Sequence, residues 1–208
     1  MNRRWWSAGL SVVAVGLVGV LAACGSTPAP SKPAKPSSTS KPATTTSAPP
    51  PFAGKVPASC DPVAAEGDVN TILGKPLTGT ANGIKGIAEA AIGRTARLDC
   101  YYGIPPNQPA PAALVSIGIA AYDNAADAAH RVLATVNTAR DTGYTSSSVQ
   151  VSGQNAVLLA GQQNQEVVLS AGTITVLVTA ANSTVQPGKA GPPLIQLAAK
   201  ALTAAQHA

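Results

Sequence analysis

A tract that cannot fold divides this chain into two parts. Residues 25 to 57 hold nine Pro and eleven Ser or Thr, and Phe52 and Val56 are their only large apolar residues. A segment of this composition buries too little apolar surface to offset the entropy of its own chain. We therefore predict a tether over residues 24 to 57 and one folded domain over residues 58 to 208. The tether would reach between about 30 Å as a flexible coil and about 100 Å as extended polyproline.

The N-terminal segment, residues 1 to 23, has the pattern of a secretory signal. Arg3 and Arg4 supply positive charge, and an apolar run of 14 residues follows from Leu10 to Ala23. A helix that spans a bilayer needs roughly 20 apolar residues, so this run indicates export and not a permanent membrane span.

The apolar run ends in Leu21-Ala22-Ala23-Cys24, which resembles the lipobox of bacterial lipoproteins. That resemblance implies that the Cys24 thiol is lipidated, that residues 1 to 23 are removed, and that the mature protein is held on the outward face of the cell membrane. Two or more acyl chains would give a stable anchor where one would be marginal. A soluble secreted protein, cleaved at a nearby Ala-x-Ala site, is the alternative.

The cysteine count predicts a disulfide between Cys60 and Cys100. The chain has three cysteines, and lipidation of Cys24 would leave these two as a pair in an exported protein. A two-cysteine metal site is the alternative, which is disfavoured because His130 and His207 are remote in sequence and have no ligand spacing. We therefore expect neither a metal nor a cofactor.

Apolar periodicity predicts an α+β domain: an antiparallel sheet of about five to six strands with helices packed on one face, in the order α-β-β-α-β-β-β(-β)-α. Asp61 and Asp123 are the expected N-caps of the first two helices. The expected helices cover residues 62–73, 124–140 and 194–206, and the expected strands cover residues 95–104, 114–122, 147–151, 156–160, 165–171 and 173–181. Residues 78 to 93, which are interrupted by Gly, are expected to form a loop with a short strand or helical turn.

Several of these segments together resemble a known group of proteins. The lipobox, the Ala/Pro/Thr-rich tether, the Ser-Cys-Asp-Pro sequence at residues 59–62, Ile-Leu-Gly at 72–74 and Leu-Asp-Cys-Tyr-Tyr at 98–102 are similar to actinobacterial, mycobacterial-type envelope lipoproteins with a two-cysteine domain of unknown function. The resemblance implies an exported, lipid-anchored protein, and it carries no catalytic residues that could be transferred to this chain.

Charge and composition exclude several function classes. The expected domain holds eight Lys or Arg against nine Asp or Glu, so the net charge of +5 resides in the N-terminal segment and the tether. A near-neutral domain with few aromatic rings argues against nucleic-acid and glycan-groove binding. The sequence shows no Gly-x-Ser-x-Gly elbow, phosphate loop or metal-binding His pair. His130, with Asp127 three residues earlier, is either a general base or, as we expect, a surface residue.

We therefore expect a non-catalytic binding or accessory module whose partner is an envelope protein or a small ligand. Alternation along the strands places Leu98, Cys100 and Tyr102 on one face and Arg97, Asp99 and Tyr101 on the other. The expected binding surface has Tyr101 and Tyr102 at its rim, although the alternation points Tyr102 inward, and a small, semi-polar floor of Ser116, Gly118, Ala120, Thr175, Leu177 and Thr179. The same face could be merely solvated. Two alternatives remain: a carrier of a lipid or small apolar metabolite, and an envelope hydrolase whose carboxylates pair only in space.

Overall fold

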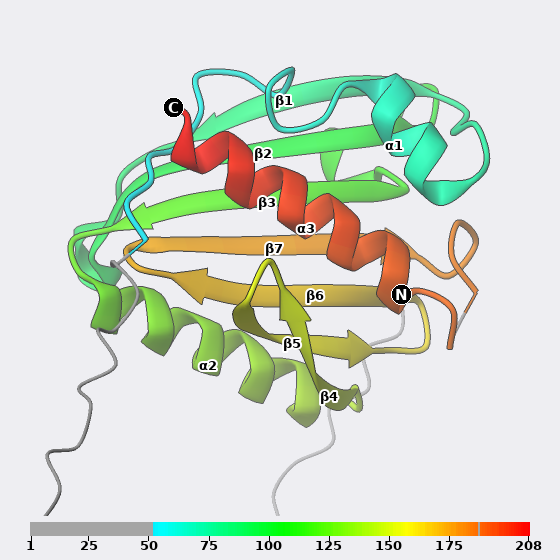
Figure 1. Ribbon diagram of the computed structural model, residues 1–208. Coiled ribbons are helices and arrows are strands. Elements are labelled where there is room, and N and C mark those ends of the chain that lie inside the picture. The colour runs from blue at the N-terminus through cyan, green and yellow to red at the C-terminus, as the bar shows by residue number, and fades with distance from the viewer. Residues whose placement is uncertain (1–51, 187) are drawn as a thin grey trace, which may run out of the picture. The chain divides into compact units, whose positions relative to one another are not determined.

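Seven strands form an antiparallel sheet in the computed structural model, which describes residues 52–186 and 188–208 (Figure 1). The spatial order is β1-β2-β3-β7-β6-β5-β4. The strands are β1 (Thr80–Gly86), β2 (Arg94–Ile104), β3 (Val115–Tyr122), β4 (Thr145–Val151), β5 (Gln154–Ala160), β6 (Asn164–Ala171) and β7 (Ile174–Ala181). The α+β class and the antiparallel sheet are confirmed. The predicted count of five to six strands is wrong. The predicted element order is also wrong, because three strands and not two precede the central helix α2 (Ala125–Asp141).

The difference in strand count comes from β1, which lies in residues 78–93, where a loop with a short strand or helical turn was expected. Its sequence is Thr-Ala-Asn-Gly-Ile-Lys-Gly, and six of its seven residues are exposed. β1 is an edge strand that pairs with β2 through its backbone. Because it buries almost no side chain, it needs no alternation of apolar and polar residues, which is the signal on which strand prediction rests.

Three α-helices accompany the sheet: α1 (Glu66–Leu73), α2 (Ala125–Asp141) and α3 (Gly191–Gln206). The predicted cap at Asp61 is wrong, because the chain makes a turn at Cys60–Val63 and α1 begins only after Ala65. The N-cap of α2 is Asn124, whose side chain accepts a hydrogen bond from the Asp127 N–H, and not its neighbour Asp123. No helix in the described part of the chain is long and apolar enough to span a membrane.

The helices lie on both faces of the sheet, so the expectation that they share one face is wrong. We call the face that packs against α3 the inner face; there Leu194 and Leu197 join Val176 and Val178 of β7 in the main core. On the opposite, outer face α2 packs its Val136 against strand residues that include Leu159 and Val168. In Figure 1, α3 crosses the sheet on the viewer's side while α2 runs below β6. β6 and β7 are apolar on the inner face, whereas their outer face alternates Val168 and Leu177 with polar residues such as Thr175.

The predicted disulfide is confirmed. Cys60 and Cys100 are bonded with Cα atoms 5.6 Å apart, and the bond ties the segment before α1 to β2. A second link lies nearby, since the buried Tyr102 hydroxyl donates a hydrogen bond to the Ala64 carbonyl at 2.7 Å. The chain around Cys60 is therefore held to the sheet at two points.

The domain uses more of the chain than predicted from composition. Phe52 and Val56, which the sequence placed in the tether, pack against the main core, and the Lys55 N–H donates to the Ala205 carbonyl at 2.8 Å. The described residues 52–186 and 188–208 belong to one compact unit with this core. The predicted signal at residues 1–23, the lipidated Cys24 and the tether up to residue 51 lie outside the described residues.

Candidate functional site

Part of the outer face is left open by α2, and this part contains the predicted semi-polar surface. α2 packs mainly on β6 and β7 and reaches β3 near Ala120 and Tyr122, where its Ala128 is buried, which leaves the outer side of β2 and of the start of β3 without a covering helix. Strand register places Tyr101 beside Ser116, Asp99 beside Gly118, and Arg97 beside Ala120 on this side. The neighbouring strand β7 extends these three cross-strand pairs: Thr179 lies beside Ser116, Leu177 beside Gly118, and Thr175 beside Ala120.

A groove runs between this open surface and α2, and we call it the sheet–helix groove. Its volume is about 90 Å³. Its sheet side includes Arg97, Gly118, Ala120, Thr175 and Leu177, and its helix side is formed by Arg131, Val132 and Thr135. Four of the six predicted floor residues thus line one hollow, because small side chains on β3 leave space that α2 does not fill.

Gly118 is needed for the shape of the groove. A Cβ atom at this position would lie 2.9 Å from Oδ1 of Asp99, closer than such atoms approach in proteins. The missing side chain therefore makes room for the Asp99 carboxylate on the neighbouring strand.

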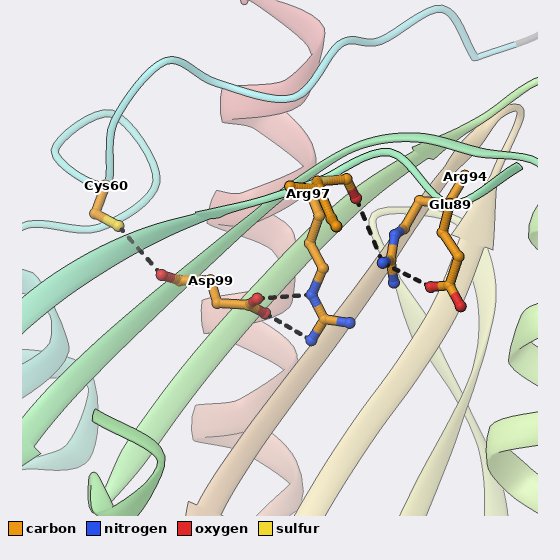
Figure 2. Close-up of polar contacts among 6 residues, drawn as sticks. Cys60, Glu89, Arg94, Arg97 and Asp99 are labelled. Carbon is orange, nitrogen blue, oxygen red and sulfur yellow. Dashed lines mark hydrogen bonds and ion pairs between the residues drawn. The ribbon is translucent and has the colours of Figure 1, made fainter. Parts of the chain in front are cut away.

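Arg97 and Asp99 form a two-point ion pair beside the groove (Figure 2). Nε of Arg97 donates to Oδ2 of Asp99 at 2.6 Å, and Nη2 donates to Oδ1 at 2.9 Å. The hydrogen bond to Asp99 raises the pKa of Arg97, with partial burial acting in the opposite direction. The pair fixes the guanidinium plane and leaves Nη1 free of hydrogen bonds within the described residues (Figure 2).

A second arginine on β2 serves the fold. Nη2 of Arg94 contacts the Glu89 carboxylate at 2.7 Å and donates to the Ile87 carbonyl at 3.4 Å, so it holds the loop that follows β1 (Figure 2). Figure 2 also marks Sγ of Cys60, which lies 4.0 Å from the Asp99 carbonyl. Because this sulfur is bonded to Cys100, it has no hydrogen to donate, and the approach is a packing contact.

Arg131 faces Arg97 across the groove and has a different environment. It is exposed on α2 and makes no ion pair with any residue in the described ranges. The positive charge of Arg97 is balanced by Asp99, whereas that of Arg131 has no such partner. The sheet–helix groove thus combines one fixed guanidinium with one free guanidinium.

The groove continues along α2 toward an acidic residue. Arg131 and Thr135 also line an adjoining hollow of about 250 Å³, together with Thr138, Tyr144 and Glu166. Burial raises the pKa of the Glu166 carboxyl, and hydrogen bonding to Asn164 opposes this shift. The continuous surface along α2 is therefore basic at one end, acidic at the other, and lined with threonine between them.

The two predicted rim tyrosines lie on opposite faces of β2. Tyr101 is half-buried on the outer face beside Asp99; burial raises its pKa, and the Asp99 charge adds to the shift. Tyr102 is 2% exposed on the inner face, and its pKa is raised chiefly by burial. Tyr102 is thus a core residue, in agreement with the alternation along the strand. Both tyrosines nevertheless line one hollow of about 280 Å³ together with Cys60 and Asn82, which is a different hollow from the sheet–helix groove. The shared rim therefore stays a prediction.

The histidines and carboxylates do not assemble into a metal site. His130 and His207 are exposed, and His130 lines a further hollow with Asp123, Asp127 and Arg131. No group of three or more potential metal ligands occurs among residues 52–186 and 188–208.

Arg131 and Glu166 were not predicted as site residues. Arg131 follows His130 in an Ala-rich helical segment without a binding motif, and Glu166 lies in an otherwise uncharged strand. The Arg97-x-Asp99 spacing was a usable signal, because opposite charges two residues apart on a strand lie on the same face. No local pattern could have placed Arg131 beside Arg97, since the two residues are 34 positions apart and meet only through packing.

No protein-family model matches the chain, and no curated protein matches it. Among solved structures, the chain is similar to the extracellular domain of PknH from Mycobacterium tuberculosis, with 13% sequence identity and a TM-score of 0.42. The similarity covers 72% of this chain and 95% of that structure.

Proposed function

We propose that this chain is a lipid-anchored envelope protein whose domain binds, without catalysis, a ligand or partner that carries an acidic group. The binding site is the sheet–helix groove. The observation that carries this proposal is the position of Arg97 and Arg131, which reach the same small groove from a strand and from a helix.

Three features support the location. The sequence Leu21-Ala22-Ala23-Cys24 follows an apolar run at the position of a lipobox. The Pro-rich tether is long enough to hold the domain away from a membrane surface. The Cys60–Cys100 bond belongs to an oxidising compartment, such as the outside of a bacterial membrane.

The groove chemistry supports an acidic ligand group. Arginine recognises carboxylates and phosphates because its planar N–H donors match their oxygens. Arg97 is already oriented by Asp99, so it loses little side-chain freedom when it binds a second acceptor. Arg131 brings a charge that makes no ion pair within the described part of the protein, although Asp123 and Asp127 line a hollow next to it. A carboxylate placed between them would accept hydrogen bonds from both.

The size of the groove distinguishes this proposal from the carrier alternative. Pockets that enclose a whole drug-sized ligand have volumes of about 300–1,000 Å³. A groove of about 90 Å³ accommodates one acidic group while the rest of the ligand lies along α2. The hydrolase alternative receives no support from Asp99, because its two oxygens are occupied by Arg97.

A pair of matched peptides tests the proposed site. We would titrate residues 48–208 with triglycine, which ends in a free carboxylate, and with triglycinamide, which does not, and follow amide shifts by NMR. We expect triglycine to perturb residues along β3 and α2 and to bind at least tenfold more tightly than the amide, since a hydrogen bond to a charged group contributes about 1.5–3 kcal/mol.

Two variants make the test specific. Arg131→Gln should remove the preference for the carboxylate. Arg140→Gln is the control, because Arg140 lies on the same helix but donates to Ser146 Oγ, away from the groove. Equal binding of the two peptides, or an unchanged preference in Arg131→Gln, would contradict the assignment of the groove.

The anchor requires a separate experiment with the full chain. In a bacterial host, the wild-type protein should partition into detergent phase and membranes, and Cys24→Ala should move it to the soluble fraction. Unchanged membrane association of Cys24→Ala would refute the lipid anchor and leave the groove proposal intact.

A further inference from the structure

The two edges of the sheet differ in how well they are protected against pairing with another strand. Exposed edges carry unpaired backbone N–H and C=O groups, and proteins usually block them with charges, Pro, Gly or bulges. β1 has such features: Lys85, two glycines, and a register shift between Thr80 and Asn82. β4, at the other edge, has none of them.

β4 is regular and uncharged. Its sequence is Thr-Ser-Ser-Ser-Val-Gln-Val, and it pairs with β5 in seven consecutive pairs with no register shift. Within the described ranges β5 is its only partner strand. Four of its residues, Thr145, Ser147, Ser148 and Gln150, are exposed. The free edge of β4 is therefore an accessible template for one more strand.

An apolar hollow lies beside this edge. It has a volume of about 350 Å³ and lies between α2 and the β4–β5 hairpin, where Ala129, Val132 and Leu133 face Ser148 and Val157, with no charged residue in its lining. The side chain of Leu133 is 61% exposed. Ser148 lies on the outer face, opposite Val157, and is too small to fill the hollow.

We propose that β4 is a docking site for an extended segment of another protein, which adds to the sheet as an eighth strand. The backbone of that segment pairs with β4, and a large apolar side chain on its outer face leans across Ser148 against Leu133. Because alternate residues of a strand share a face, the segment carries apolar side chains at every second position. This docking site adjoins the sheet–helix groove, with which it shares Val132 and Val168, but it uses neither Arg97 nor Arg131.

The part of the chain that would remain after the predicted cleavage before Cys24 does not suit this hollow, and neither does a second copy of the domain. Residues 25 to 51, which lie outside the described structure, contain no large apolar residue, and their Pro residues lack the N–H that strand pairing requires. A second copy would present β4 itself, whose outer-face residues Ser146, Ser148 and Gln150 are polar. Either occupant would leave Leu133 exposed, so the occupant is a strand from a different protein.

A designed peptide is the probe. We would titrate residues 48–208 with Lys-Thr-Val-Thr-Leu-Thr-Val-Thr-Lys, and with a version in which the three apolar residues are Ser, and follow amide shifts and hydrogen exchange by NMR. We expect the apolar peptide to perturb β4 and the Leu133 region, to slow exchange of β4 amides, and to bind more than tenfold more tightly than the Ser peptide.

The variants distinguish pairing at the β4 edge from nonspecific apolar binding of the peptide. Leu133→Ala should weaken binding roughly fivefold by removing exposed apolar surface, and Ser148→Lys should abolish it. His130→Ala is the control, since His130 is exposed on the same helix but lines a different hollow. Equal binding of both peptides, or shifts confined to other parts of the domain, would overturn the proposal. Sedimentation of the free domain provides a further test. If the domain is a dimer and Ser148→Lys dissociates it, the β4 edge binds a second copy and the proposal is wrong.

Discussion

Removal of the Cys60–Cys100 disulfide should weaken the domain strongly without changing its fold. The bond joins residues separated by 40 positions, and it fixes the turn before α1 onto β2. The perturbation is the double substitution Cys60→Ala and Cys100→Ala, which leaves no free thiol in residues 48–208. The folded state keeps its second link, because the Tyr102 hydroxyl still reaches the Ala64 carbonyl.

The magnitude follows from the loop that the disulfide closes in the unfolded chain. For a loop of this length the chain-entropy relation gives a loss of about 4 kcal/mol in the free energy of unfolding. In a domain of this size, 1 kcal/mol corresponds to about 2–4 °C in Tm, so the expected decrease is roughly 8–16 °C.

Urea and thermal unfolding of residues 48–208 measure this change, with circular dichroism as the signal. The wild-type protein under reducing conditions is the matched control and should unfold near the double variant. A loss below about 1 kcal/mol in both samples would refute the reasoning, because it would show that the disulfide hardly restricts the unfolded chain.

Three further predictions use the same unfolding assay. Tyr102→Phe should lower the free energy of unfolding by about 1–3 kcal/mol, because it leaves the Ala64 carbonyl without its buried donor; no change would show that water replaces the hydroxyl. Gly83→Ala should also destabilise the domain, since its Cβ would lie 2.8 Å from Sγ of Cys60; wild-type stability would mean that the edge strand shifts freely. Burial raises the pKa of Glu166, so the folded state holds this proton more tightly and stability should fall as pH rises from the ordinary carboxyl pKa through the raised one. Glu166→Gln should remove that part of the pH dependence, and an unchanged pH profile would argue against a raised pKa.

Much of the secondary structure followed from local pattern. The alternation through Leu98, Cys100 and Tyr102 predicted β2 and correctly turned these three side chains to the core. The apolar spacing of α3 did the same for Leu194 and Leu197. These elements were predictable because each buries one face, and burial of one face imposes a period on the residues.

The helix starts were predicted less well, because several residues compete for the cap. Asp123 and Asn124 are both good N-cap residues, and the backbone geometry of the β3–α2 connection selected Asn124. Asp61 stands before Pro62 in a typical helix-start pattern, yet the disulfide at Cys60 holds that turn against β2 and the helix begins later. The position of the α1 start was therefore decided by a distant part of the chain, which no local pattern reveals.

Composition and the period within single elements were enough to predict the α+β class, the pairing of the two domain cysteines and the inward position of Tyr102. Packing between distant elements was needed to place α2 on the outer face, to bring Arg131 across the groove from Arg97, and to leave β4 as an unprotected edge of the described sheet. Each of these depends on which strands become neighbours, and the spatial order β1-β2-β3-β7-β6-β5-β4 arises from the packing of both sheet faces against helices. No local run of residues carries that information, because many strand orders satisfy the same alternation.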